Sequence, residues 1–330
     1  MRRSVAVALL CTGLLALAMA AGLLAGVKSL SLPTLLEVAL GRGDAEARLI
    51  LLELRLPRVV LGCLVGAALG IAGGIIQAAT RNPLGDPGLL GINAGAGLAI
   101  VVGAGLLGLS GMGALLTLAA AGAALAALGV QSLAGLVQGS SAPLRLTLAG
   151  VAVGAMCMGL TQAIALADPE RFDLVRNWRV GSLAGDAGLI LPSLVPALGV
   201  GLVATALLAP RLNIAALGEE RAASLGLSIG VTRGLALFVT VLLAGTATAA
   251  AGPVAFVGLA APHAARRLAG ADERAVLLNA GLIGAALIAA ADALGRIAAA
   301  PAEIPVGVVT ALLGAPILVL LVGGRRGVAR

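Results

Sequence analysis

The side chains that could ligate a metal ion or carry nucleophilic chemistry are few and scattered. The chain has one histidine, three cysteines and 15 acidic residues among its 330 positions. His263 follows Pro262 and precedes two arginines, with no cysteine or second histidine near it. A structural or gating hydrogen bond is therefore a better interpretation of His263 than haem or metal ligation. We expect no metal site and no catalytic residue in this chain.

The cysteines and the glycines give no sign of an enzyme either. Cys11, Cys63 and Cys157 lie in apolar runs without C-x-x-C spacing, which favours buried small side chains over a disulfide or a metal site. The pattern G-x-x-x-x-G-K-[ST] of a phosphate-binding loop occurs nowhere. If the protein moves a solute uphill, the energy must come from a partner protein or from an ion gradient.

The composition indicates an integral membrane protein. Hydrophobic residues make up 60% of the chain, charged residues only 11%, and the mean hydropathy is +1.10, whereas a soluble domain has about 25% charged residues. The 48 glycines predict closely packed helices. The net charge of +7 does not indicate nucleic acid, because the basic residues lie in short loops and the chain has one Trp and no Tyr for stacking on bases.

Apolar runs near the ~20 residues that a spanning helix needs predict an all-α polytopic fold with about ten transmembrane helices. The run from Val5 to Val27 is too long for the apolar core of a signal peptide, which has about 7–15 residues. The eighth run follows Gly252-Pro253 and is short, which is typical of a part-helix buried among neighbours. The predicted spans are 5–27, 57–79, 89–108, 112–138, 144–167, 188–209, 232–251, 254–265, 275–295 and 304–322.

Basic residues predict the orientation of these spans. With the N-terminus inside, thirteen of the 22 Lys and Arg residues fall on inner segments and nine on outer ones, a modest positive-inside bias. Both termini are then cytoplasmic. Residues 28–56, with a possible short surface helix, and residues 168–187 lie outside, residues 210–231 lie inside, and residues 1–330 form one transmembrane domain.

Residues 81–97 interrupt the apolar pattern on the inner side. Asn82-Pro83 and Asp86-Pro87 predict a sharp turn after the second span. Asn93, Gly95 and Gly97 then begin the third span with residues that permit close packing near a transport pathway. Asn93 is predicted as a helix cap in preference to a substrate ligand.

Four stretches together resemble one family. LRLPRVVLGCLVGAALGIAGGIIQAATRNPLGDPGLLGINAGAG (54–97), LNIAALGEERAASLGL (212–227), GPVAFVGLAAPHAARRLAG (252–270) and ADALGRIAAAPAEIPVGVVTALLGAP (291–316) are similar, in the same order, to motifs of the membrane permease subunit of ABC importers for iron siderophores, haem and cobalamin (type II importers). The resemblance covers nearly the whole chain. It implies ten helices per subunit, a homo- or heterodimer with the pathway between subunits, two ATPase subunits inside and a binding protein outside.

The resemblance implies that the inner segment couples the helices to the ATPase. In the family, a pair of short helices rests in a cleft of the ATPase subunit, and a compact knob with small residues and a few charges suits such a contact. An ordinary solvated loop is the alternative. The residues concerned are Leu217, Gly218, Glu219, Glu220, Arg221, Ala222, Ser224, Leu225 and Gly226.

Three arginines at predicted outer helix ends match docking positions of the family. Arg55, Arg58 and Arg296 would grip acidic residues of the binding protein, since a guanidinium can hold a carboxylate with two hydrogen bonds. Snorkelling of these side chains at the membrane edge is the alternative. Asp292 lies four residues before Arg296, so a local ion pair could occupy that arginine instead.

The remaining expectations concern the pathway and the cargo. Gate candidates are Asn93, Gly95, Gly97, Gly252, Pro253 and His263. The resemblance implies that ATP and Mg²⁺ bind the partner subunit, that this chain binds no cofactor, and that it lies in the bacterial inner membrane. A ferric siderophore is the favoured cargo, with haem or cobalamin as alternatives. An ion-coupled secondary transporter would need paired acidic residues at mid-membrane, where only Asp292 is a candidate; an intramembrane enzyme would need a nucleophile–base pair.

Overall fold

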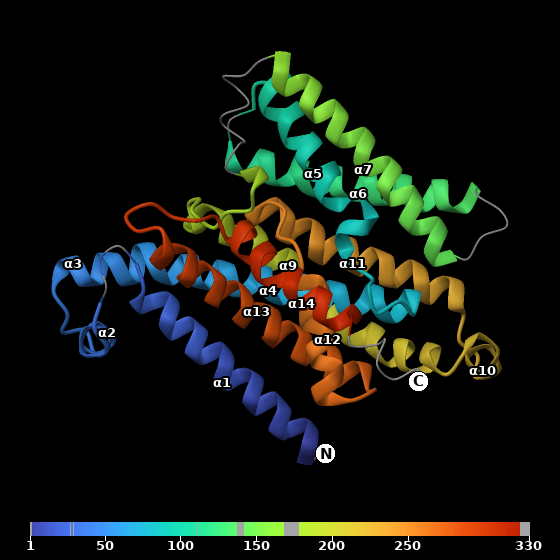
Figure 1. The fold of residues 1–330 in the computed structure, drawn as a ribbon, viewed down its shortest axis with the longest axis horizontal. Coiled ribbons are helices and arrows are strands. Elements are labelled where there is room, and N and C mark those ends of the chain that lie inside the picture. Colours follow the sequence, from blue (N-terminus) through green and yellow to red (C-terminus); the bar gives the residue numbers. More distant parts are fainter. Residues whose placement is uncertain are drawn as a thin grey trace.

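The protein is described by a computed structural model that covers the backbone of residues 2–26, 28, 30–109, 111–136, 142–167 and 178–323. These residues form helices joined by turns, with no strand among them (Figure 1). The α-helices are α1 Arg2–Leu24, α2 Leu32–Ala39, α3 Ala45–Arg48, α4 Leu56–Thr80, α5 Ile92–Val101, α6 Met112–Leu136, α7 Ala142–Ala167, α9 Ala187–Ala216, α10 Glu219–Ser224, α11 Ile229–Ala251, α12 Val257–Ala269, α13 Glu273–Ala298 and α14 Val306–Gly323.

Seven segments of the described chain are long and apolar enough to cross a membrane: Val5–Leu24, Ala45–Thr80, Met112–Leu136, Leu144–Ala167, Ala187–Ala216, Ile229–Ala251 and Glu273–Ala298. Two shorter apolar helices, Ile92–Leu106 and Val306–Pro316, and the 13-residue α12 coincide with the other three predicted spans. The helical, polytopic membrane fold is thus confirmed. The count of ten crossings and the cytoplasmic termini stay predictions, and residues 324–330 lie outside the described residues.

The long helix α4 is the centre of the bundle. It packs against α13, α11, α12 and α9 (Figure 1). In the most apolar 18-residue stretch of the segment that contains α4, 78% of the residues are buried. The corresponding share for α1, at the periphery, is 22%. The residues around α4 are mainly Ala, Gly, Val, Leu and Ile, so the core forms where small residues let the backbones approach.

Glycines make this close approach possible. A Cβ added to Gly66 would lie 2.2 Å from the carbonyl oxygen of Gly284 in α13, and one added to Gly73 would lie 1.8 Å from the carbonyl oxygen of Gly258 in α12. Real Cβ contacts essentially never fall below 3.0 Å. Both sites therefore require glycine, which confirms the predicted close packing.

A second group of helices, α5 to α7, packs against this core mainly at α11 (Figure 1). α5 and α6 approach closely at Gly95 and Gly122, where a Cβ on either residue would lie 2.4 Å from the other's carbonyl oxygen. α5 continues into a π-helical turn, Val102–Leu106. The predicted close packing at Gly95 is confirmed.

Two predicted boundaries are wrong. The second span does not begin at residue 57, because α3 and a π-helix, Leu49–Arg55, lead without a break into α4. The sixth span does not end at residue 209, because α9 continues through Pro210 to Ala216. A proline inside a helix removes one backbone hydrogen bond and clashes with the preceding turn, but here the helix tolerates both.

The segment after α1 contains the predicted surface helix. Ser31 caps α2, because its side chain accepts a hydrogen bond from the amide of Thr34 at 3.3 Å, and α2 has proline in its first turn. Of the other predicted outer segment, 168–187, residues 168–177 lie outside the described residues.

Candidate functional site

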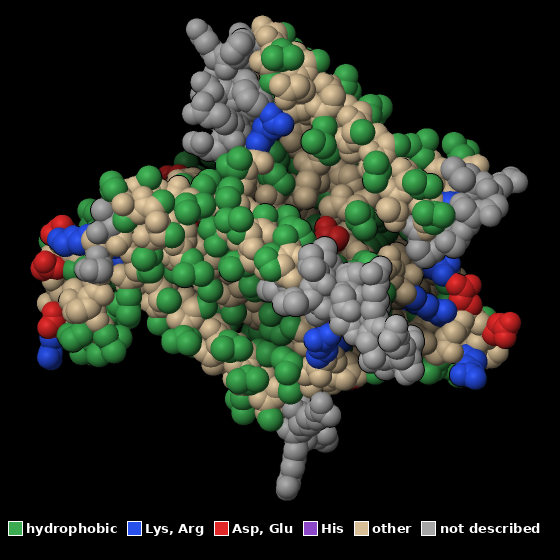
Figure 2. Space-filling model, viewed as in Figure 1, with side chains coloured by type: hydrophobic (Ala, Val, Ile, Leu, Met, Phe, Trp, Pro, Cys, Tyr) green, Lys and Arg blue, Asp and Glu red, His purple; other side chains and the backbone are tan. Residues whose placement is uncertain are grey.

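Charged side chains gather at two opposite ends of the bundle. We call them the α2 end, which carries α2 and α3, and the α10 end, which carries α10. On the face shown in Figure 2, most Lys, Arg, Asp and Glu side chains lie at these two ends, and the surface between is mainly apolar. The residues predicted to couple to an ATPase lie at the α10 end, and the predicted docking arginines lie at the α2 end.

The α10 end is a short helix between two glycines. Gly218, with φ +113°, separates α9 from α10. At the C-terminus of α10, the amide of Gly226 donates to the carbonyl of Ala223 at 2.9 Å and the amide of Leu227 donates to the carbonyl of Ala222 at 3.0 Å. These two bonds are the Schellman pattern of helix termination. The glycine stop is confirmed. The described segment holds a single six-residue helix where the resemblance implied a pair, because its first part extends α9.

α10 projects from the bundle as a knob. Ala222 is fully buried against the protein, whereas Leu217 and Leu225 are 52% and 64% exposed. Glu219, Glu220, Arg221, Ser224 and Gly226 are also exposed. Two exposed leucines with charges around them form an apolar centre and a polar rim, which is the composition of a protein contact.

Hydrogen bonds connect the base of this knob to the core. In α9, the Asn213 amide nitrogen donates to Asp272 Oδ1 at 2.7 Å, and the Glu273 backbone amide donates to Asn213 Oδ1 at 2.8 Å. Glu273, which is 4% exposed, pairs with Arg266 of α12. These contacts connect the end of α9 to α12 and α13. The sequence analysis did not predict this network of hydrogen bonds and an ion pair, because the residues that form it belong to three separate helices.

The turn at residues 81–91 re-enters the bundle as predicted. Arg81 ends α4 with φ 51°, and Asn82 Oδ1 accepts from the Leu84 amide at 3.0 Å. Asp86 Oδ1 accepts from the Gly88 amide at 2.7 Å and starts a 3₁₀ turn, Pro87–Leu90. Burial raises the pKa of Asp86, opposed by that hydrogen bond. Arg81 also donates to the carbonyl of Ala215, so the turn contacts the end of α9.

Asn93 is not a helix cap. The cap position of α5 is Gly91, with φ 72°, and Asn93 lies inside the helix. Its Oδ1 accepts a hydrogen bond from Thr248 Oγ1 of α11 at 2.9 Å. The predicted role was wrong because a glycine in the left-handed region begins this helix in place of a side-chain cap. Asn93 instead links the α5–α7 group to the core.

Replacing Thr248 with valine is expected to loosen this link. The change preserves shape but removes the donor to Asn93, at a cost of about 0.6–1 kcal/mol, as for other polar contacts between membrane helices. Thermal unfolding of the purified chain in detergent measures the effect.

The matched control is Thr246→Val. Thr246 donates only within its own helix, to the carbonyls of Leu242 and Leu243. Equal destabilisation by the two substitutions would contradict an interhelical role for Thr248.

The predicted gate residues Gly252 and Pro253 lie in a break between α11 and α12. Gly252 has φ +73°, and a Cβ there would lie 2.0 Å from the carbonyl oxygen of Trp178. The backbone around the break is paired: the Ser182 amide donates to Ala251 O at 2.8 Å, and Trp178 Nε1 donates to Ala249 O at 3.0 Å. The predicted short eighth helix is confirmed, although it begins at Val257.

Two other gate candidates lie near these segments. Gly97 faces the ring of Trp178, with Cζ3 3.5 Å from where a Cβ would be. His263 is half-buried in α12, after Pro262. Gating by any of these residues stays a prediction.

At the α2 end, two of the predicted docking arginines are buried. Arg55 and Arg296 are 7% and 4% exposed. Arg55 donates to the carbonyls of Leu23, Leu24 and Lys28, and Arg296 donates to those of Gly22 at 2.7 Å and Ala25 at 2.9 Å. The two guanidinium groups thus bind the last carbonyls of α1, where a cation also interacts favourably with the helix dipole.

The third arginine belongs to an ion-pair network. Arg58 lies 2.8 Å from Asp292 Oδ1 and 2.8 Å from Glu303 Oε2, and Arg296 lies 3.1 Å from Asp292 Oδ2. The alternative ion pair between Asp292 and Arg296 is therefore present. In this conformation Arg55 and Arg296 do not offer their guanidinium groups to another protein, whereas Arg58 pairs with Glu303, whose side chain is 36% exposed. Docking by the three arginines stays a prediction.

The structure gives no support for a metal centre in its described part. No group of three or more His, Cys, Asp or Glu residues there could hold an ion. Cys11 and Cys157 are buried, Cys63 is half-buried, and all three are free thiols, as their apolar surroundings predict.

Comparison with known proteins identifies the family. A model of the FecCD transport family matches residues 14–323. The chain is 46% identical to the ferric enterobactin transport system permease protein FepD of Escherichia coli (strain K12), over 94% of this chain and 92% of that protein. It is 40% identical to the iron(3+)-hydroxamate import system permease protein FhuG of Bacillus subtilis (strain 168), over 87% of each.

The fold agrees with this identification. A solved metal-chelate type ABC transporter in an inward-facing conformation matches with a TM-score of 0.84 at 27% identity, over 96% of this chain and 98% of that one. The resemblance of the motifs is thereby confirmed. This chain belongs to the FecCD transport family.

Proposed function

We propose that this protein is the transmembrane subunit of an ATP-driven importer that carries a ferric siderophore across the bacterial inner membrane. Family membership and relatives named for ferric enterobactin, iron(3+)-hydroxamate and iron(3+) dicitrate support this cargo. The exposed knob at α10, with Leu217 and Leu225 beside a buried Ala222, is the observation that carries the mechanism. Haem and cobalamin are the alternative cargoes.

In this mechanism the chain itself hydrolyses nothing and holds no resident cofactor. ATP and Mg²⁺ bind two ATPase subunits, which receive α10 in a cleft. Closure of the ATPase dimer moves α10 and the end of α9, and the hydrogen bonds of Asn213 with Asp272 and Glu273 pass this movement to α12 and α13. The broken backbone before α12 is a natural place for access to switch between the two sides.

The proposed importer needs partner proteins besides the two ATPase subunits. A second permease subunit, identical or homologous, completes the pathway, and a substrate-binding protein docks at the α2 end. Arg58 is the guanidinium best placed for a carboxylate of that protein, since its pairing with Glu303 is at the surface. An ion-coupled transporter is a poorer interpretation, because both oxygens of Asp292 face arginines.

Replacing Leu225 with aspartate is expected to abolish ATP-dependent uptake. The substitution places a charge at the apolar centre of the knob, so the ATPase subunits should no longer co-purify with the permease. Uptake of a ferric siderophore into vesicles that contain ATP measures the effect.

Leu40→Asp is the matched control. Leu40 is 70% exposed at the α2 end, far from α10, so its replacement should leave co-purification of the ATPase subunits intact, and co-purification is the measurement compared between the two variants. Uptake that persists without ATP and follows a proton gradient would overturn the proposal, and preferential uptake of haem or cobalamin would overturn the cargo.

A further inference from the structure

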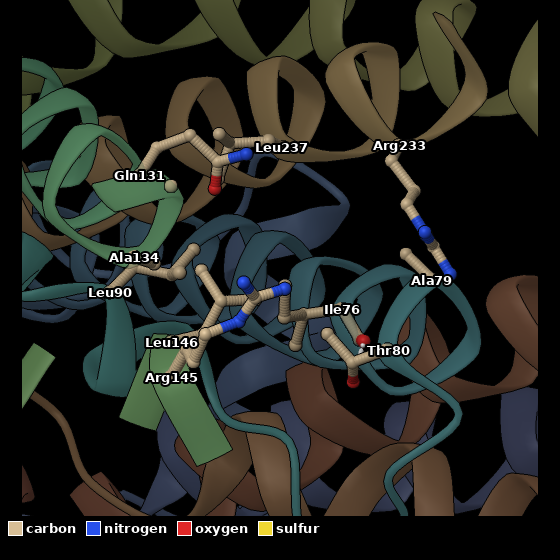
Figure 3. Close-up of a pocket in the computed structure, with 11 residues that line it drawn as sticks. Ile76, Ala79, Thr80, Leu90, Gln131, Ala134, Arg145, Leu146, Arg233 and Leu237 are labelled. Atoms are coloured by element: carbon tan, nitrogen blue, oxygen red, sulfur yellow. Dashed lines mark hydrogen bonds between the residues drawn. The ribbon is translucent and has the colours of Figure 1, made fainter. Parts of the chain in front are cut away.

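A cavity of about 230 Å³ opens between the two groups of helices at the α10 end. Figure 3 shows Arg145 extending toward Ile76 and Arg233, from another helix, extending toward Ala79, with the Gln131 amide beside Leu237. Apolar side chains form the rest of the wall. The lining residues are Ile76, Ala79, Thr80, Leu90, Gln131, Ala134, Gly135, Arg145, Leu146, Arg233 and Leu237.

The cavity lies at the ends of four helices. Thr80 is the last residue of α4, Gly135 is next to the end of α6, and Arg145 and Arg233 are the fourth residue of α7 and the fifth residue of α11. All four helices are apolar and long enough to cross a membrane. Their ends at one level mark the boundary between hydrocarbon and water.

The lining combines two arginines with mainly apolar residues, and one of these arginines, Arg233, also pairs with Glu219. None of the eleven described lining residues is acidic. Asp86 lines an adjoining cavity of about 20 Å³, beyond Ile76 and Leu90. The nearby surface of α6 and α7 is apolar, with leucines between 43% and 77% exposed at positions 133, 136, 144 and 148.

We propose that this cavity binds the headgroup phosphate of an anionic phospholipid. Two guanidinium groups from different helices suit a phosphodiester, and basic pockets between spanning helices are a known setting for lipid headgroups. The exposed leucines give the acyl chains an apolar surface. A headgroup with its own cation, such as choline, would place that cation among the arginines and is disfavoured.

An ion pair connects the site to α10. Arg233 also pairs with Glu219, the first residue of α10, with side chains 49% and 56% exposed. The lipid phosphate therefore competes with Glu219 for the same guanidinium. Occupation of the cavity loosens α10 from α11, so the lipid influences the segment that the proposed function assigns to coupling.

Binding of short-chain phosphatidylglycerol to the purified full-length chain in an uncharged detergent tests the site. The double variant Arg145→Gln/Arg233→Gln is expected to weaken binding roughly tenfold or more, because two charge-assisted hydrogen bonds are lost. Arg211→Gln, an exposed arginine of α9 outside the cavity, should leave the affinity unchanged. No ATP or partner subunit is involved, so the result is separate from the coupling test.

A second variant blocks the cavity and keeps its charges. A Cβ on Gly135 meets no described atom within 4 Å, so Gly135→Leu should extend into the cavity and reduce binding to a similar extent. Gly129→Leu is the control on the same helix, because its Cβ is equally unobstructed by described atoms and Gly129 does not line the cavity.

Four outcomes would overturn the proposal. The first is that phosphatidylcholine binds as tightly as phosphatidylglycerol. The second is that inorganic phosphate displaces the lipid at equal concentration. The third is that the Arg145/Arg233 and Gly135 variants bind phosphatidylglycerol as tightly as the unchanged protein. Finally, Glu219→Gln is expected to tighten binding about two- to fivefold by releasing Arg233, and an unchanged affinity would contradict the shared guanidinium.

Discussion

Replacing Asp292 with alanine is expected to destabilise the protein by about 3–5 kcal/mol, since the change removes one partner of a buried ion-pair network. Asp292 has a side chain 5% exposed and faces Arg58 with one oxygen and Arg296 with the other. Without it, two guanidinium groups remain close together, with Glu303 as the nearest described carboxylate of the network. Denaturation of the purified chain in mixed micelles measures the free energy of unfolding.

A surface ion pair at the same end provides the comparison. Lys28 and Glu46 pair with side chains 57% and 62% exposed, so Glu46→Ala is expected to change the stability by about 1 kcal/mol or less. If Asp292→Ala and Glu46→Ala had similar effects, the network would contribute little to stability.

Gly73→Leu is the second change with a large expected effect. A Cβ at this position would lie 1.8 Å from the carbonyl oxygen of Gly258, and the atom it meets is backbone rather than a flexible side chain. α4 and α12 would have to separate, at a cost of about 3 kcal/mol or more, as in other overpacked cores. The yield of folded protein and its midpoint of thermal unfolding in detergent should both fall.

Gly154→Leu is the matched substitution on a peripheral helix. A Cβ on Gly154 of α7 meets no described atom within 4 Å, so the same change should leave the stability nearly unaltered or raise it through better helix propensity. A normal yield of folded Gly73→Leu protein would show that the α4–α12 contact can open without penalty.

Much of the fold could be predicted because hydropathy and length constrain membrane helices so strongly. Each predicted span falls on a described helix. The errors came from local backbone: Pro210 looked like a helix end, and the π-helix Leu49–Arg55 looked like a surface segment. A periodicity of hydrophobic residues reports neither a tolerated proline nor a change of helical type.

The candidate site was predictable in its residue types and less so in its contacts. Arg296 and Asp292 are four residues apart on one helix, so their pairing was foreseen as an alternative. The contact of Arg58 with Asp292 joins two distant helices and has no local signal. The cavity with Arg145 and Arg233 was missed for the same reason, because its wall is assembled from residues 76 to 237.

The hydrogen bonds from Arg55 and Arg296 to the end of α1 have a consequence for the order of assembly during biosynthesis. α1 precedes α13 in the chain, and Arg296 lies 271 residues after Ala25, so the hydrogen bond between them can form only after the intervening helices have been made. Before that, Arg55 can already bind the end of α1, because it lies only 32 and 31 residues after Leu23 and Leu24. A chain that stops short of α13 would therefore hold the end of α1 through Arg55 alone of these two arginines.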